Sequence, residues 1–307
     1  MRLAGALLCC LLLALSSYGD ESTSEGNGHR FAAGEIRRYL AETVQEVSWR
    51  SAGDDLTYTT TLAMELSCYV DHVDGNEVLL VWRVLDLRVR HRGPDGEHFL
   101  DSASDTGLDD PLLGDLMIYH LLPLKTRIDR RNGAVLEFRG QEALIERLKQ
   151  RHPAANPLAA NPRAEAAQRA FDPLRMAALF HRYLVVPGTQ DRFPLGQGLD
   201  VELPLHWDDN AFEFTLPEDT APPSITLHHD PTPVIVHLSA LKGTGSSVLN
   251  NGVLERVHGS IDMTLSGSAL TQPVDQKHAI QWQLALLTRT PPSDNTDDRD
   301  NGDNDTP

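Results

Sequence analysis

Apolar and polar residues alternate one by one over two long parts of the chain. A period of two is that of a β-strand with one buried face and one solvated face. The first part carries its apolar side chains at Leu56, Tyr58, Leu62, Met64, Leu66, Cys68 and Val70. The second carries them at Val257, Ile261, Met263 and Leu265, and then at Ile280, Trp282, Leu284 and Leu286. Both parts therefore predict long antiparallel strands.

Turn residues divide the strands. Asp74-Gly75 predicts a tight turn, and Pro94-Asp95-Gly96 predicts another. Between these turns, Glu77 to Arg90 is nearly continuous in Val and Leu, which indicates a central strand. Shorter strands are predicted at 199–207, 212–216 and 234–241.

The middle of the chain has a helical period instead. Three helices are predicted there: Asp110 to Leu122, which stops before Pro123; Gln141 to His152; and Arg163 to Tyr183, which Pro173 interrupts. Two short strands, Leu124 to Asp129 and Ala134 to Arg139, lie between the first two helices. Asn132-Gly133 joins these strands and predicts a type I′ hairpin.

Strands, then helices, then strands favour an α+β fold that is mainly β. We expect a long antiparallel curved sheet or a partly closed barrel, with two or three helices in the middle of the chain. The two long strand pairs have similar layouts, which suggests an internal duplication around the helical middle. Such a sheet needs a cover for its apolar concave face, and either the helices or a ligand would provide it.

The two ends of the sequence differ from the rest. Residues 1–19 predict a signal peptide, with Arg2 before a short apolar run and cleavage after Ser16 or Gly19. Residues 20–28 predict a linker, 29–290 a single β-rich domain and 291–307 a disordered acidic tail. The apolar run is too short for an ordinary membrane-spanning helix. We therefore expect an exported protein, periplasmic or extracellular, with no transmembrane span in its mature chain.

The three cysteines do not predict a disulfide. Cys9 and Cys10 would leave with the signal peptide, and the bulky Leu7 and Leu8 before them argue against lipidation. Cys68 would then be alone in the mature chain, so no internal disulfide can form. Its place in an apolar strand stripe predicts a buried small hydrophobe.

The charge excludes some partners. The formal net charge is -17, from 44 acidic and 27 basic residues. Nucleic acids and anionic membranes are therefore unfavourable partners, because binding them requires Lys and Arg.

Three stretches of the sequence resemble an uncharacterised, domain-of-unknown-function family of exported bacterial proteins. They are HRFAAGEIRRY (His29 to Tyr39), FLDSASDTGLDDPLLGDLMIYHLLPLKTRIDRRNGAVLEFRGQEALIERL (Phe99 to Leu148) and GVLERVHGSIDMTLSG (Gly252 to Gly267). The resemblance implies an exported β-rich domain and no particular activity. The acidic tail and the Pro/Asn-rich insert after His152 are not part of the pattern.

Four groups of residues suggest chemistry, but each has a simpler interpretation. His228, His229 and Asp230 are dense in metal ligands, yet neighbours on a strand point to opposite faces. Asp101 and Ser102 are expected in a turn or cap rather than a catalytic dyad. The segment Gly243 to Ser247 lacks the lysine of a phosphate loop and predicts a flexible hairpin loop. The tail does not match a calcium loop, because Arg299 occupies a ligand position.

The sequence therefore assigns no catalytic, cofactor-binding or metal-binding residue. The leading hypothesis is a non-catalytic binding or scaffolding protein of the cell envelope, whose concave sheet accepts a lipid, a hydrophobic peptide or an envelope protein. The alternatives are an extracytoplasmic hydrolase whose site forms only in three dimensions, and a structural protein that oligomerises.

Overall fold

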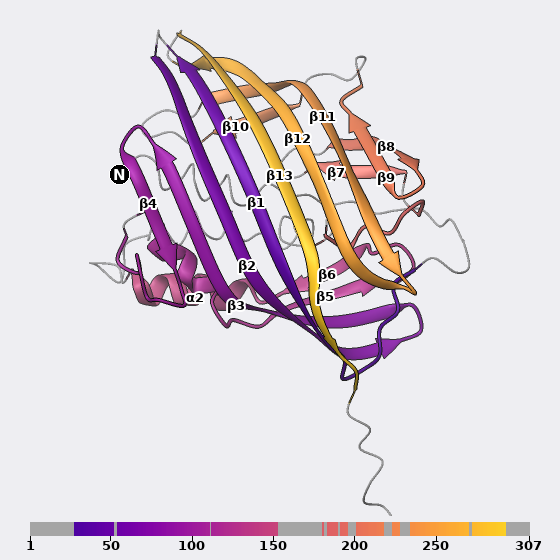
Figure 1. Ribbon diagram of the computed structural model, residues 1–307. Helices are drawn as coiled ribbons and strands as arrows, with labels where there is room; N and C mark the ends of the chain where they lie inside the picture. Colours follow the sequence, from indigo (N-terminus) through magenta and orange to yellow (C-terminus); the bar gives the residue numbers. More distant parts are fainter. Residues whose placement is uncertain are drawn as a thin grey trace, which may run out of the picture.

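A computed structural model shows one large, curved β-sheet (Figure 1). The structure describes residues 28–51, 54–110, 112–152, 180, 183–189, 191–195, 201–217, 223–227, 234–269 and 272–292. The predicted signal peptide, almost all of the linker and most of the acidic tail lie outside these ranges. So do His228, His229 and Asp230, and most of the predicted helix Arg163 to Tyr183.

The sheet contains thirteen strands. Six of them are 16 to 21 residues long: β1 (Ile36–Ser51), β2 (Asp54–Asp74), β3 (Glu77–Gly93), β11 (Val234–Asn250), β12 (Val253–Ala269) and β13 (Gln272–Thr290). The others are β4 (Gly96–Asp101), β5 (Leu124–Asp129), β6 (Val135–Arg139), β7 (Arg192–Leu195), β8 (Val201–Asp208), β9 (Ala211–Thr215) and β10 (Ser224–Leu227). All strand ladders are antiparallel, so this part of the fold prediction is confirmed.

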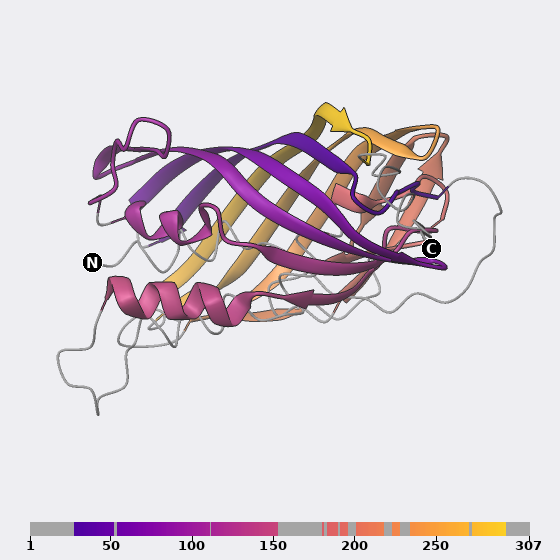
Figure 2. The same ribbon diagram turned by 90° about the horizontal axis from the view of Figure 1, so that it is seen from below.

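The strand order runs β6-β5-β3-β2-β1-β13-β12-β11-β9-β8-β7, with β4 on β3 and β10 on β11. No ladder joins β6 to β7 among the described strands, so the sheet is open and no barrel closes there. Seen from below, the long strands form an arch, and the helix at 141–151 lies on its concave side (Figure 2). The first and last described strands, β1 and β13, lie side by side at the centre of the sheet.

Two helices have both ends within the described residues. The helix α2 (Gln141–Arg151) confirms the second predicted helix. The first predicted helix, Asp110 to Leu122, was too long, because only a 3-10 helix, η1 (Gly114–Tyr119), forms there. Asp110 accepts bonds from the N–H groups of Leu112 and Leu113, which makes a turn before η1. Leu121 then adopts a left-handed φ of 59°, which ends the helical conformation.

The predicted turns are mostly confirmed, with one exception. Gly75 and Gly96 have positive φ and lie at the β2–β3 and β3–β4 turns. The type I′ prediction for Asn132-Gly133 was wrong, because only Gly133 has positive φ and the loop runs from residue 130 to residue 134. The residue pair with positive φ at both positions is Asn251-Gly252, between β11 and β12.

The prediction of a flexible loop at Gly243 to Ser247 was also wrong, since these residues lie inside β11. A Cβ atom on Gly243 would overlap the Phe214 ring, and one on Gly245 would overlap the Phe212 ring. The glycines therefore make room for two aromatic rings of β9 that lie flat on the strand. Gly259 of β12 is covered in the same way by the Trp282 ring.

Candidate functional site

The concave face of the sheet carries the predicted apolar stripes. Buried side chains of β2 lie at even positions up to Val70, as the alternation predicts, and those of β13 lie at even positions up to Leu284. In β1 the buried side chains lie at odd positions, including Tyr39 and Ala41. In β3 the parity changes at Leu85, because the pairing with β2 shifts by one residue there. The apolar core of the molecule therefore lies on this face.

An aromatic cluster fills the concave face near the start of β1. Trp82 packs against Tyr39 at a ring-centroid distance of 6.1 Å and against Phe180 at 5.3 Å. Phe180 also stacks on Phe138 at 5.8 Å. The Trp82 indole donates to the Thr126 hydroxyl at 2.9 Å, so the polar atom of this ring is satisfied. Phe180 is a helical residue, and its ring covers this part of the sheet.

The opposite part of the concave face is less covered. Val47 and Trp49 of β1 are only half-buried, and so are their partners Tyr58 and Leu56 in β2. These four residues form an apolar end of the face with remaining solvent exposure. Accessibility therefore increases along β1 from Tyr39 to Trp49.

Buried polar residues border the accessible end on β1, β2 and β3, and on β13 they lie level with it. We call Gln45, Thr60, His91, Gln276 and His278 the polar stripe. Gln45 pairs with Thr60, and Thr60 pairs with His91, so three of its members lie side by side on β1, β2 and β3. His278 of β13 pairs with Val47, two residues along β1 from Gln45. Each member is less than 9% exposed, which is uncommon for polar side chains on an apolar sheet face.

Hydrogen bonds account for part of the polar stripe. The Thr60 hydroxyl bonds Nδ1 of His91 at 2.9 Å, and Nε2 of His278 bonds Oε1 of Gln276 at 3.1 Å. Two buried atoms have no partner: Nε2 of Gln45 and Nδ1 of His278. Burial lowers the pKa of His278 to about 4, so its ring is neutral at pH 7. Burial also lowers the pKa of His91, and the nearby His98 adds to that effect.

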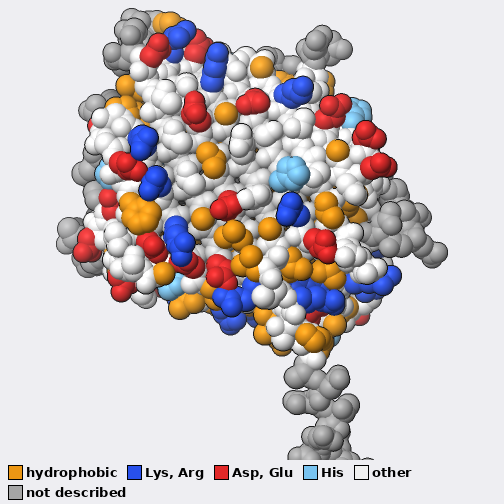
Figure 3. Space-filling model, viewed as in Figure 1, with side chains coloured by type: hydrophobic (Ala, Val, Ile, Leu, Met, Phe, Trp, Pro, Cys, Tyr) orange, Lys and Arg blue, Asp and Glu red, His pale blue; other side chains and the backbone are white. Residues whose placement is uncertain are grey.

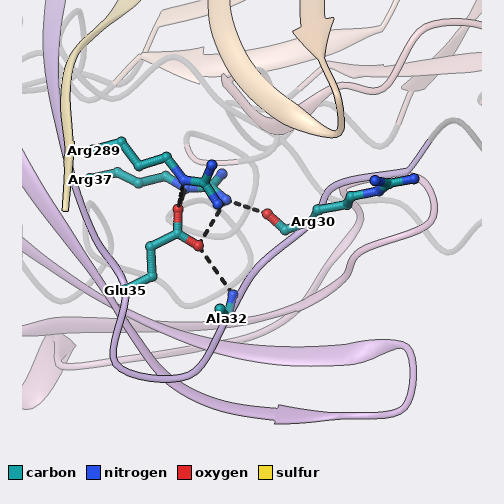
Figure 4. A network of polar contacts seen from close by, with 5 residues as sticks. All are labelled: Arg30, Ala32, Glu35, Arg37 and Arg289. Carbon is teal, nitrogen blue, oxygen red and sulfur yellow. Dashed lines mark hydrogen bonds and ion pairs between the residues drawn. The ribbon is translucent and has the colours of Figure 1, made fainter. Parts of the chain in front are cut away.

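A buried ion-pair network closes the end of the sheet at the start of β1 (Figure 4). Arg37 and Glu35 are completely buried, and Nε of Arg37 donates to Oε1 of Glu35 at 2.8 Å. Arg289 of β13 donates to the same carboxylate, and the backbone N–H of Ala32 donates to Oε2 at 3.1 Å. Arg37 also donates to the carbonyl of Arg30. Burial alone would raise the pKa of Glu35, but the hydrogen bonds from Arg37 and Arg289 outweigh it and hold the pKa below its ordinary value.

The residues before β1 extend this closure across the sheet. We call Gly28 to Glu35 the N-terminal strap. Its His29 N–H donates to the carbonyl of Arg130 at 2.6 Å, and its Arg30 N–H donates to that of Gly252 at 2.6 Å. The strap therefore links the β5–β6 loop to the β11–β12 turn. The His29 ring donates to the carbonyl of Leu184 at 2.7 Å, so the strap also holds the buried segment that contains Leu184.

The predicted turn role of Asp101 and Ser102 is confirmed. Asp101 accepts from the N–H of Ala103 at 2.9 Å. The Ser102 hydroxyl donates to Asp86 at 2.8 Å and accepts from the N–H of Leu87 at 2.8 Å. The hydroxyl is therefore held by a carboxylate and the backbone, an arrangement that fastens the end of β4 to β3.

Cys68 is a buried free cysteine, as predicted. Burial raises the pKa of its thiol, which keeps it protonated and unreactive. The neighbouring acidic residues Asp208 and Asp209 lie exposed at the β8–β9 turn. Asp55 is exposed near the start of β2 and pairs with Arg50 at 2.8 Å.

Hydroxyl groups meet histidine rings at three places in the described sheet. Thr60 bonds His91 in the polar stripe, while Ser224 bonds His237 and Ser246 bonds His258 at exposed positions. None of these three rings is also hydrogen-bonded to a carboxylate, so these pairs lack the third member of a catalytic triad. Within the described ranges, no group of three metal-ligating side chains converges. No described helix is long and apolar enough to span a membrane.

The sequence interpretation missed the polar stripe, because β1 was not predicted as a strand. Thr60 belongs to a predicted strand, His91 lies one residue beyond the predicted strand Glu77 to Arg90, and Gln276 and His278 precede the last apolar stripe. Continuing the alternation of the predicted strands through these positions would have placed all four on the same face as the apolar stripes. Gln45 could not be placed, since β1 mixes charged and apolar residues on both faces.

Comparisons with known proteins give no family. No family model matches the chain, and no curated protein matches it. Among solved structures, lipovitellin, from a study of its lipid–protein interactions, is similar over 85% of this chain, with 11% identity and a TM-score of 0.41. The chain spans only 26% of that lipovitellin chain.

Two further solved structures are similar. DynF, from the dynemicin biosynthesis pathway of Micromonospora chersina, shares 7% identity over 90% of this chain and 96% of its own, with a TM-score of 0.22. An outer membrane channel from Pseudomonas putida F1 shares 9% identity over 87% of this chain and all of its own, with a TM-score of 0.23. All three TM-scores are below 0.5, so these similarities say nothing about the function of this chain.

Proposed function

We propose that this protein is a non-catalytic binding protein of the cell envelope that holds a lipid or another apolar molecule on its concave face. The observation that carries the proposal is the half-buried apolar end of that face, at Val47, Trp49, Leu56 and Tyr58. Apolar and aromatic side chains beside a few buried polar groups are typical of small-molecule sites. The proposed export, by a signal peptide in residues 1–19, would place the protein where envelope lipids are available. Membership of the uncharacterised exported family is part of the same proposal.

The charge distribution on the convex face favours a ligand on the opposite face. Charged side chains of both signs are scattered over the upper convex surface, whereas apolar and basic side chains gather along its lower edge (Figure 3). The exposed large apolar residues of β1 and β13 are Ile36, Val44 and Leu287. Ile36 and Leu287 lie close to one another, at the start of β1 and near the end of β13, and Val44 lies eight residues further along β1.

The test is to express the full chain and purify it from the periplasm of the expression host without denaturant. The mass of the purified chain shows whether cleavage occurs after Ser16 or Gly19. A solvent extract is then analysed by mass spectrometry beside an unrelated exported protein. We expect a near-stoichiometric apolar molecule that is absent from the control.

Two valine variants locate the ligand. Val47→Gln places an amide on the accessible end of the concave face, and Val44→Gln places the same group on the convex face, where Val44 is 40% exposed. The proposal requires that only Val47→Gln loses the co-purified molecule while both variants stay folded. An empty wild-type protein would instead direct the search to protein partners and then to a screen of hydrolase substrates.

A further inference from the structure

The polar stripe has a specific hydrogen-bonding need. Nε2 of His278 bonds the amide oxygen of Gln276, which can only accept, so Nε2 carries the ring proton. In the neutral ring, Nδ1 of His278 is then a bare acceptor without a donor. Nε2 of Gln45 is a donor without an acceptor. Each unmatched buried group costs free energy, so a complementary ligand gains from matching both.

Gln45 and His278 occupy diagonal positions on the adjacent strands β1 and β13. Gln45 pairs with Ile280, and His278 is two residues from Ile280 on the same face of β13. Diagonal neighbours on adjacent antiparallel strands have their Cβ atoms about 7 Å apart, within reach of long side chains. One group that accepts from Gln45 and donates to His278 would satisfy both, and a hydroxyl does this.

The stripe also selects against charge. It consists of two glutamines, a threonine and two histidines, with no Asp, Glu, Lys or Arg among them. An ionised carboxylate or phosphate buried there would have no countercharge, and desolvation without one is strongly unfavourable. A carboxylate or phosphodiester head also has no proton to donate to Nδ1 of His278.

We propose that the polar stripe is the head-group subsite for an uncharged amphiphile with a free hydroxyl, of the long-chain alcohol or monoacylglycerol class. Its apolar chain lies on Val47, Trp49 and Leu56, which neighbour the stripe on β1 and β2. This inference rests on the proposed function and specifies the ligand class. A single buried water has the same donor and acceptor capacity, so occupation by water alone is the competing outcome.

Three probes, each built on a ten-carbon chain, separate these outcomes. The protein is delipidated on a hydrophobic resin, and binding is followed by tryptophan fluorescence and calorimetry at about pH 8, where decanoate is ionised. Decanol donates and accepts, decyl methyl ether only accepts, and decanoate carries a charge. We expect decanol to bind about tenfold more tightly than either of the others, as one to two hydrogen bonds imply.

Paired variants assign the preference to the stripe. His278→Leu should abolish the preference for decanol over the ether while leaving the ether bound as before, and Gln45→Met should weaken decanol and the ether alike, because both accept from the Gln45 amide. Gln281→Met and His258→Leu, at exposed positions of β13 and β12, are the matched controls and should keep the preference. If a stripe variant fails to fold, the three probes on the wild-type protein still decide.

The two proposals fail in different ways. Equal binding of decanol and its methyl ether would overturn the head-group subsite and leave water as its occupant, while apolar binding would stand. Tighter binding of decanoate would also overturn it. No binding of any probe, with an empty protein after purification, would overturn the proposed function itself.

Discussion

At the residue scale, Glu35 holds together the end of the sheet where β1 begins. It receives hydrogen bonds from Arg37, Arg289 and the Ala32 backbone, and both it and Arg37 are completely buried. A buried pair adds little net stability compared with apolar residues of similar size, but removing one member leaves the other charge buried without a partner.

We therefore expect Glu35→Gln to lower the free energy of unfolding by about 3 kcal/mol. Urea denaturation followed by circular dichroism measures this. Glu65→Gln is the control, because Glu65 pairs with the half-exposed Arg38 and its loss should cost less than about 1 kcal/mol. Equal losses in the two variants would show that the buried network is no more important than a surface pair.

His29 and His278 predict the acid sensitivity of the fold. Burial is the main cause that lowers the pKa of each ring from 6.5 to about 4. Between these values the unfolded chain binds more protons than the folded protein, so the free energy of unfolding falls as pH falls from 6.5 to about 4. At about pH 5 each histidine should make the free energy of unfolding roughly 2 kcal/mol lower than it is at neutral pH.

Urea denaturation at about pH 7.5 and about pH 5 measures the difference. His278→Leu should remove the roughly 2 kcal/mol that this ring contributes, because a leucine does not titrate, whereas His29 and His91 still do. An undiminished pH dependence in this variant would mean that the His278 ring is protonated or hydrated in the folded protein.

At the element scale, strand β11 depends on glycines that seat aromatic rings. Gly243→Ala would push a methyl group into the Phe214 ring, which must shift together with β9. Overpacking of this kind costs about 1–3 kcal/mol. Thermal unfolding should show a lower midpoint for Gly243→Ala and almost no change for Thr244→Ala, whose side chain is exposed. Adding Phe214→Leu to Gly243→Ala should recover part of the loss, since the smaller side chain leaves room for the methyl.

These glycines also show how far sequence patterns predict elements. The alternation in β2, β12 and β13 was readable because one face is apolar and the other polar. Gly243 and Gly245 interrupt that signal, since their apolar contacts are supplied by rings of another strand. The sequence of β1 does not alternate between apolar and polar residues, because Arg37 and Gln45 lie on its concave face and Ile36 and Val44 on its convex face. The polar stripe was hidden for the same reason, since its residues converge only after β1 is placed between β2 and β13.

At the scale of the whole molecule, the sheet has one seam that joins distant parts of the chain. β1 pairs with β13 over its full length, from Ile36 opposite Thr290 to Ser51 opposite Val274. The β2–β3 and β12–β13 ladders, by contrast, join strands that follow one another directly. Closing a long loop costs more chain entropy, and folds with such contacts form slowly.

We therefore expect the seam to form last. In pulsed hydrogen exchange during refolding, amides in the β2–β3 and β11–β12 ladders should become protected before the β1 amides that pair with β13. Because β1 also pairs with β2, only amides directed at β13 are diagnostic. Protection of both groups in a single phase would indicate that the sheet forms all at once.

The position of the seam has a consequence for the nascent chain during translation. One partner of β1, the first described strand, is β13, the last described strand, so the ladder between them cannot form until β13 has been synthesised. The β1–β13 ladder therefore stays unformed during synthesis, although the β2–β3 hairpin can form earlier. A sheet without its central ladder is less stable than the finished one, which would ease passage through a secretory pore in the export that we propose.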